Sequence, residues 1–251
     1  MRRSLLYTSI GLIAFLGFLV TYLPASLVWA QFKDKATVVL PALKILKIEG
    51  SLWDGRADVR VGDVFPSRVT WQLAGRRLFA GGLPLQITAT GTGHNLAVQL
   101  TLTPGSLRFE HLRGNLQPDY LNQLGAPFGL AVSGDVSLDD IQLSVNQTWF
   151  TAAAGQLNWT GGRFSFPDPR GLGHINLPPL RGQISLQAND FNLDVTHRDN
   201  DLDAQLVSLR LKPNGWVKVA IKARLFKLAE LSWPPSDSLD DTALALEEKL
   251  F

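Results

Sequence analysis

Apolar side chains recur at every second position over most of the chain after residue 80. In residues 96–102, Leu or Val occupies every even position, and Ala, Gln or Thr occupies every odd one. Because successive side chains of a strand point to opposite faces, this period predicts strands with one apolar and one polar face. The same period marks residues 83–87, 130–138, 141–145, 184–188, 191–195, 202–206 and 217–225.

The segments between these strands are short and rich in turn-forming residues: Gly91–Gly93, Thr103–Gly105, Asn189–Asp190, Asp199–Asn200 and Pro213–Gly215. Short connections predict antiparallel neighbours, because a parallel crossover needs a dozen residues or more. We therefore expect a mainly β protein built on a long, curved antiparallel sheet. Its apolar face must be covered, so a groove, a barrel-like form and a sandwich all remain open.

Two segments depart from this period. Pro118–Gly125 (PDYLNQLG) begins with Pro and ends with Gly, which predicts a short helix. Ser238–Phe251 has apolar residues at positions 239, 243, 246 and 250, with acidic residues near its start. That spacing predicts an amphipathic C-terminal helix.

The N-terminal segment from Leu5 to Leu23 has no charged residue, and as a helix it would be about 28 Å long, enough to cross a bilayer. Arg2 and Arg3 precede it, which favours a cytoplasmic N-terminus. Val28–Ala30 loosely resembles a signal-peptidase site, but the apolar run is longer than a signal core. We therefore expect a cytoplasmic N-terminus (1–4), a retained transmembrane helix (5–23), an exported β domain (24–235) and a C-terminal amphipathic helix or tail (236–251).

Composition excludes several classes of site. The net charge of +2 gives no basic patch for nucleic acid, and the absence of Cys excludes disulfides and thiolate chemistry. Four histidines are present, none in a metal-ligand spacing, so we expect ordinary surface or turn residues: His94, His111, His174 and His197. The acidic clusters Asp139–Asp140 and Asp199–Asp203 are expected at turns.

No phosphate loop and no nucleophile motif is present in the sequence. We therefore predict no catalytic residue, no metal ligand and no cofactor, and the chain is expected not to be an enzyme.

The block Ile48–Val59 (IEGSLWDGRADV) is the most distinctive motif. It predicts a strand, a Gly-bounded turn and a returning strand, with an indole available to cap the core. Its pattern is G-x-L-W-x-G-x-A, and a strand carrying a further Trp follows; the matching residues are Gly50, Leu52, Trp53, Gly55, Ala57 and Trp71.

This arrangement, downstream of an apolar segment that ends near Pro24–Ala25, resembles the type II secretion system protein N family of Gram-negative bacteria. Similar stretches at 107–116, 125–138, 155–159 and 171–182 extend the resemblance over roughly residues 5–225. It implies an inner-membrane-anchored periplasmic component that acts through protein–protein interaction with other inner-membrane secretion components. The motif residues are then expected to have a structural or interaction role.

An alternative comes from a broader, architectural similarity to AsmA-like envelope proteins, which combine an N-terminal membrane helix with a curled sheet. That similarity implies binding or transfer of lipid or another hydrophobic ligand. The two functions make different demands on the apolar face of the sheet: a filled interior favours partner binding, and an open channel favours lipid.

Overall fold

The computed structural model describes residues 18, 22–39, 42–62, 64–73, 82–168, 171–199, 202–231 and 238–249. The expected transmembrane segment Leu5–Leu23 lies outside these residues, apart from Phe18, Tyr22 and Leu23. Among the helices that are described, none combines the length and hydropathy that crossing a bilayer requires.

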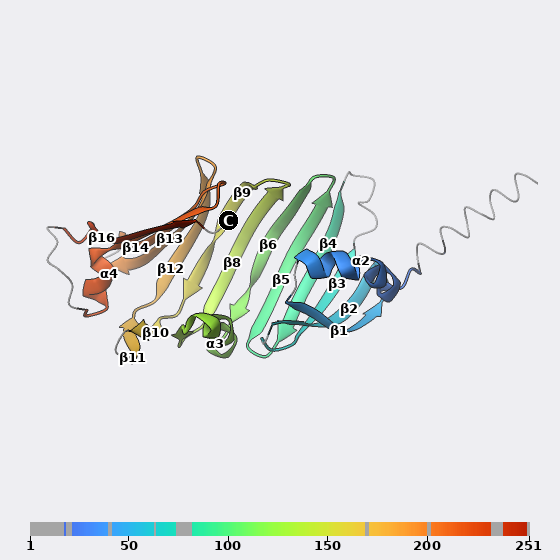
Figure 1. Cartoon of the computed structure of the whole chain (residues 1–251), viewed down its shortest axis with the longest axis horizontal. Helices are drawn as coiled ribbons and strands as arrows, with labels where there is room; N and C mark the ends of the chain where they lie inside the picture. Colours follow the sequence, from blue (N-terminus) through green and yellow to red (C-terminus); the bar gives the residue numbers. More distant parts are fainter. Residues whose placement is uncertain are drawn as a thin grey trace, which may run out of the picture.

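Within the described residues, thirteen strands form one continuous antiparallel sheet (Figure 1). Its order follows the sequence, except that β7, β10 and β11 leave it, so that β6 pairs with β8 and β9 with β12. The strands are β1 (Leu43–Gly50), β2 (Asp54–Val61), β3 (Ser67–Leu73), β4 (Leu83–Gly91), β5 (His94–Thr103), β6 (Ser106–Leu116), β8 (Val136–Asn146), β9 (Phe150–Trp159), β12 (Leu180–Gln187), β13 (Asp190–Asp199), β14 (Leu202–Leu211), β15 (Trp216–Lys222) and β16 (Thr242–Lys249).

The departing strands form a small second sheet in the order β11 (Gly171–Leu177), β10 (Gly162–Asp168) and β7 (Ala131–Val132). Helix α3 (Pro118–Gly125) and the short 3-10 helix η2 (Ala126–Phe128) lead into β7, so this group lies along one rim of the large sheet (Figure 1). Helix α2 (Ala25–Val39) lies at the β1 end, and α4 (Ala223–Leu228) lies near the β16 end.

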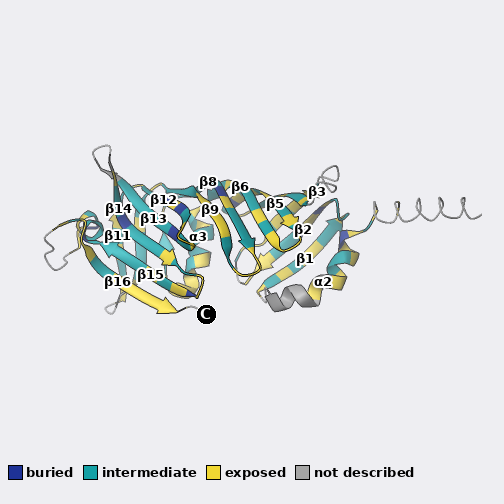
Figure 2. Ribbon diagram, turned by 90° about the horizontal axis from the view of Figure 1, so that it is seen from above, coloured by how far each residue is buried: buried dark blue, intermediate teal, exposed yellow. Residues whose placement is uncertain are grey.

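Paired bulges bend the middle of the large sheet. His111 in β6 and Asp140 in β8 both adopt positive φ, 55° and 48°, and the β6–β8 register shifts beside them. The His111 imidazole lies 2.6 Å from the Asp140 carboxylate, which ties the two bulges together across the strands. Because bulges increase local twist and bend a strand, they help to curve the sheet into a trough (Figure 2).

The predicted architecture is confirmed in its main features. The fold is mainly β and antiparallel, and the short helix occupies the predicted residues, Pro118–Gly125. Of the three arrangements left open by the sequence, the groove is the one that the structure adopts.

The predicted C-terminal amphipathic helix is wrong. Residues Thr242–Lys249 form β16, which pairs with β15 along its length. In this register Leu244 lies opposite Ile221 and Leu246 lies opposite Val219. Pairing therefore satisfies the backbone groups of β16 that face β15 and extends the apolar face of the sheet, which outweighs the helical propensity of its Ala, Leu and Glu residues.

Three further expectations need correction. The strand predicted for 217–225 ends at Lys222, where the chain turns into α4. The predicted run 130–138 is divided between two sheets, since β7 pairs with β10 while β8 pairs with β6. Asp139 and Asp140 lie inside β8 at its bulge, not at a turn, because Asp tolerates the left-handed conformation that the bulge needs. The sequence reading also missed α2.

Candidate functional site

The strand registers align apolar positions into a row that crosses the large sheet from edge to edge. One residue from each of the thirteen described strands contributes to it, and each lies directly opposite the next in the ladder. The row is Ile48, Ala57, Val69, Ala89, Leu96, Gly114, Leu138, Leu157, Gly182, Val195, Val207, Ile221 and Leu244. The alternation seen in the sequence therefore produces one continuous apolar face.

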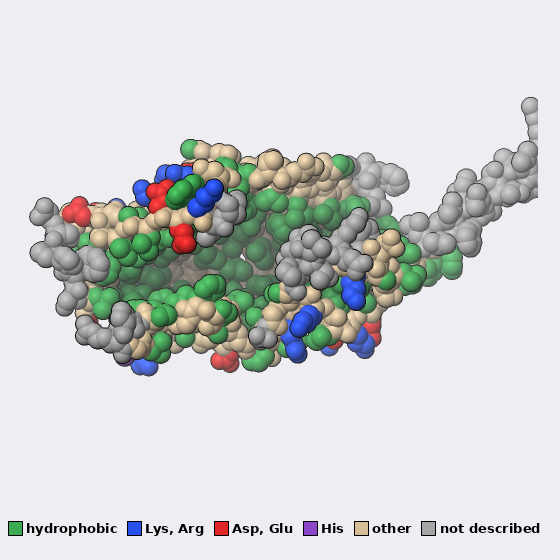
Figure 3. Space-filling view, in the orientation of Figure 1, with side chains coloured by type: hydrophobic (Ala, Val, Ile, Leu, Met, Phe, Trp, Pro, Cys, Tyr) green, Lys and Arg blue, Asp and Glu red, His purple; other side chains and the backbone are tan. Residues whose placement is uncertain are grey.

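Among the described residues, α2 lies over the β1 end of this face and the small sheet lies over its β12–β16 end, and no continuous second layer joins them. Apart from Ala57 and Gly182, every member of the row is only half-buried. The hydrophobic core cluster of the described residues is small, with Ile141, Ala153 and Ile184 at its centre. The space-filling view shows hydrophobic side chains lining a hollow that runs along the sheet (Figure 3). We call this hollow the groove.

Near its β12–β16 end, the groove deepens into an apolar chamber of about 540 Å³. The large sheet and α4 supply one side of the chamber, through residues that include Trp159, Val207 and Ile221. Helix α3 and the small sheet supply the facing side, through residues that include Leu121 and Phe164. The pairing of β7 with β10 holds this facing side together.

At the other end, the hairpin that carries the motif joins the N-terminal segment to the sheet, and Leu52 and Trp71 are the motif residues that line this joint. The Leu52 N–H donates to the Leu23 carbonyl at 3.0 Å, and Pro24 forms a β-bridge with Ser51. Leu52 and Trp71 line a cavity of about 180 Å³ with Ala25 and other apolar residues of α2 and β1. Ala57 and Ala25 are both buried.

Two glycines make this joint possible. Gly50 has φ of 92°, and a Cβ atom there would lie 2.6 Å from the Asp54 carbonyl oxygen. A Cβ atom on Gly55 would lie 2.3 Å from the Trp71 ring. The Trp71 indole N–H lies 3.3 Å from the Ser51 carbonyl and 3.2 Å from the Leu52 carbonyl, so one donor holds the turn that carries Trp53. Trp53 itself is half-buried in that turn.

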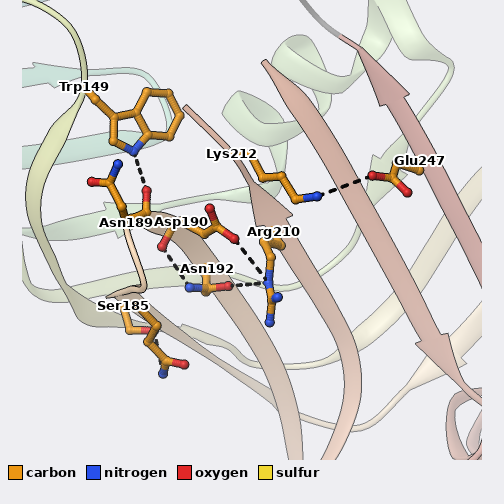
Figure 4. Close-up of polar contacts among 9 residues, drawn as sticks. Trp149, Ser185, Asn189, Asp190, Asn192, Arg210, Lys212 and Glu247 are labelled. Carbon is orange, nitrogen blue, oxygen red and sulfur yellow. Dashed lines mark hydrogen bonds and ion pairs between the residues drawn. The ribbon is translucent and has the colours of Figure 1, made fainter. Parts of the chain in front are cut away.

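The opposite face of the sheet is polar. On β13 and β14, Arg210 Nε donates to Asn192 Oδ1 at 3.1 Å and lies 3.9 Å from the Asp190 carboxylate (Figure 4). Lys212 forms an ion pair with Glu247 of β16 at 3.6 Å, and the Trp149 indole donates to the Asn189 carbonyl at 2.7 Å (Figure 4). These contacts tie neighbouring strands and turns together.

A second concave surface, of about 610 Å³, lies on β1–β4 and is lined mainly by polar side chains such as Thr70, Gln72 and Thr88. Beside it, hydrogen bonds from Lys47 and Arg56 lower the pKa of the Glu49 carboxyl. These charged groups are mostly exposed, so solvent screens them and they do not form a preorganised catalytic pair.

The histidines do not form a common site. His94 is buried at 6% exposure, which corrects the expectation of a surface or turn residue, and its ring lies 4.2 Å from that of Tyr120 in α3. His111 pairs with Asp140, His197 Nδ1 lies 3.1 Å from the Pro179 carbonyl, and His174 is exposed on β11. In the part of the chain that the structure describes, no three His, Asp or Glu side chains are grouped to hold a metal ion.

The sequence profile of the family described as type II secretion system (T2SS), protein N, matches residues 41–232. The chain belongs to this family. The match runs from the start of β1 past the end of α4, so it includes all six motif residues, nearly all of the groove and the chamber. Neither the curated proteins nor the solved structures give a significant match.

Membership in the protein N family places the chain in type II secretion and confirms the resemblance drawn from the motif. The groove is the functional feature that sequence reasoning left undecided. The chamber was missed altogether, because it depends on the pairing of β7 with β10, which are far apart in the sequence.

Proposed function

We propose that this protein is a non-enzymatic component of the type II secretion system that binds a lipid or another hydrophobic ligand in its groove, at the periplasmic face of the inner membrane. The observation that carries the proposal is the apolar row that crosses thirteen strands and stays half-exposed. It satisfies the condition that favours the lipid alternative over a purely structural role.

The apolar row is continuous across all thirteen strands and keeps part of its surface accessible, which is typical of a face that binds something. Soluble monomers rarely expose contiguous apolar patches larger than a few hundred Å², and larger ones mark binding or membrane sites. Burying such surface stabilises by about 25 cal/mol per Å². A hydrocarbon ligand in the groove would bury the accessible part of the apolar row and so stabilise the complex.

The position of the groove supports a membrane source for the ligand. The apolar segment that we expect to span the bilayer ends at Leu23, which is hydrogen-bonded to Leu52 in the first hairpin. The motif joint would therefore hold the β1 end of the groove close to the membrane surface. In this proposal Gly50, Gly55 and Trp71 serve to fix that placement.

Interaction with other inner-membrane secretion components is the second candidate. The large sheet has two edge strands among those described, β1 and β16, and each pairs on one side only. Edge strands readily accept a strand from a partner. This role is compatible with a lipid in the groove, because an edge partner would occupy backbone groups and not the apolar face.

Native mass spectrometry of the full chain, purified from its own membranes in mild detergent, tests the proposal. We expect stoichiometric phospholipid or another apolar molecule that survives detergent exchange. Leu100→Asp places a charge on the groove face and should remove most of the bound apolar molecule, because burying an uncompensated charge is unfavourable. Gln99→Asp, the adjacent residue on the outer face, is the matched control and should retain it.

A wild-type protein without any bound apolar molecule would overturn the lipid proposal. Recovery of cross-linked secretion subunits on β1 or β16 under the same conditions would then establish the second candidate.

A further inference from the structure

The chamber differs from the rest of the groove because it has walls on two sides. Val207 and Ile221 of the large sheet face the same space as Phe164 and Ile175 of the small sheet. Among the described residues, α2 lies over the β1 end of the row, and the small sheet faces the large sheet at the chamber, which stays partly open to the groove. The chamber is therefore the part of the groove best built to hold a defined ligand.

We infer that the chamber holds the terminal part of one hydrocarbon chain of a lipid whose remainder lies in the open groove. This inference rests on the proposed function and assigns a position to the ligand. The chamber volume, about 540 Å³, lies within the range of about 300–1,000 Å³ that is typical of small-molecule sites.

The chemistry of the lining selects hydrocarbon over a polar ligand. Two polar side chains reach the chamber, Asn122 and Trp159. The Asn122 Oδ1 already accepts a hydrogen bond from the Val132 N–H at 2.7 Å, and the Trp159 indole already donates to the Ser133 carbonyl at 3.1 Å. The Asn122 side-chain N–H groups are then the remaining polar groups of these two side chains. A ligand that carries several polar groups would lose hydration at this depth and find few partners, at a cost of about 1–3 kcal/mol for each unpaired group.

The lining favours hydrocarbon over a segment of a protein partner. The chamber is lined almost wholly by apolar side chains from both sheets, α3 and α4. A peptide placed there would bring backbone amides into apolar surroundings, where an unpaired amide is unfavourable.

The path into the chamber is continuous with the membrane-proximal end of the groove. The apolar segment outside the described residues ends at Leu23, beside β1. From Ile48 of β1 the row runs strand by strand to Val207 and Ile221 in the chamber wall. A hydrocarbon chain that enters beside α2 therefore meets apolar side chains or glycine at each strand on the way to the chamber.

Photo-crosslinking of the full-length protein in detergent tests this position. One probe is phosphatidylglycerol with a diazirine on the terminal carbon of one acyl chain, and a second is the free fatty acid with the same diazirine. After irradiation, mass spectrometry of peptides locates the adducts. We expect adducts on β10, β11, β14 and β15, and a preference between the probes identifies phospholipid or fatty acid as the source.

Adducts confined to β1–β6 would overturn the chamber inference while leaving the proposed function intact. Absence of any lipid adduct, together with lipid-free protein in native mass spectrometry, would overturn both. These outcomes separate failure of the position from failure of the function.

Val207→Trp fills the chamber and should lower the crosslinking yield by about tenfold, because the large side chain takes the space of the probe. Ser208→Trp, the adjacent residue on the opposite face of β14, is the matched control and should leave the yield unchanged. Circular dichroism checks the fold of both variants. Equal yields from folded Val207→Trp and wild type would overturn the inference.

Phe164→Ala enlarges the chamber from the other side and provides a test if Val207→Trp does not fold. It should shift the best-retained probe toward a longer acyl chain. An unchanged chain-length preference in the folded variant would overturn the inference.

Discussion

The two ends of the groove are finished in different ways. At the β1 end a single helix, α2, is attached through apolar contacts that include Ala25, Leu52 and the indole of Trp71. At the β16 end, α4 and a second sheet build a chamber, and the chain is held by backbone bonds such as Ala223 N–H to the Asp241 carbonyl at 2.9 Å. The β1 end attaches the N-terminal helix to the sheet, and the β16 end forms the chamber.

Between them, the middle of the sheet supplies the stability that neither end can supply alone. Its buried cluster, Ile141, Ala153 and Ile184, is formed within one layer by side chains of neighbouring strands. The comparison teaches that a long sheet can keep most of its apolar face open when a short central cluster is packed tightly and the ends are fixed. It also predicts which substitutions should be severe and which should be mild.

Trp71→Ala should have the largest effect, because it removes both hydrogen bonds that hold the motif turn together with the packing against Gly55. Replacement of a packed Trp typically lowers the free energy of unfolding by about 3–5 kcal/mol. Denaturant unfolding of the full chain in mild detergent measures this loss in the free energy of unfolding. Trp53→Ala, in the same turn and half-buried, should cost less.

The same variant distinguishes attachment from general stability. If the joint fixes α2, trypsin should cleave at Lys33 faster in Trp71→Ala than in wild type, under conditions where the sheet stays folded. Equal cleavage rates would show that other contacts hold α2, and the conclusion that the joint attaches α2 at the β1 end would then be wrong.

Ile184→Ala tests the central cluster and should lower the free energy of unfolding by about 3 kcal/mol, because Ile184 is buried among packed neighbours. Leu100→Ala, a similar truncation on the open groove face, should cost about 1 kcal/mol, since Leu100 is only half-buried. Urea unfolding of both variants gives the difference. Equal losses would mean that the groove face is packed as tightly as the centre.

Much of the large sheet was predictable because period-two alternation and short turns are local signals. The α3 helix was predictable for the same reason, since Pro118 and Gly125 mark its ends. The C-terminal strand was misread because Leu239, Ala243 and Leu246 also fit helical spacing. Only its pairing with β15, a tertiary contact, decides between the two structures.

The candidate site was less predictable than the fold. Alternation places apolar residues on one face but is the same for a closed barrel and an open groove, so the sequence could not choose between them. The chamber depends on Ala131 and Val132 pairing with Phe164 and Ser165 across more than thirty residues. The motif residues stood out by their resemblance to the family, but the close approach of Gly50, Gly55 and Trp71 is visible only in the structure.

His94→Phe tests how α3 is attached to the sheet, and its effect should be smaller. The buried His94 ring packs on Tyr120, and its Nε2 has no hydrogen-bond partner among the described residues. Phe preserves the ring contact and removes the unpaired Nε2, but it also loses the long contact of Nδ1 with the Thr92 carbonyl, 3.4 Å. The two effects oppose each other, so we expect a change of less than about 1 kcal/mol in the free energy of unfolding.

His94→Ala should instead destabilise the protein, because it leaves a cavity beneath α3. His174→Phe, at an exposed position of β11, is the control and should change little. A loss of stability in His94→Phe well above about 1 kcal/mol would show that the contact of Nδ1 with the Thr92 carbonyl outweighs the unpaired Nε2.

The smallest effect is expected at the central bulge pair and depends on pH. A hydrogen bond from His111 lowers the pKa of the Asp140 carboxyl, and a further bond comes from Gln142. A carboxyl group whose pKa is lower in the folded than in the unfolded state stabilises the protein above its unfolded pKa, about 3.9, and that stabilisation is lost as pH falls through the folded pKa.

Asp140→Asn keeps a residue that tolerates the φ of 48° and removes the charge. The wild type should therefore be slightly more stable than Asp140→Asn at neutral pH, and unfolding curves of the two should converge below about pH 4. Asp139→Asn, at the exposed neighbouring position, should show no such pH-dependent difference. A difference in the free energy of unfolding between Asp140→Asn and wild type that stays constant from pH 7 to about pH 3 would contradict this prediction. Asp140 would then act through the backbone conformation of the bulge, and not through the contact of its charge with His111.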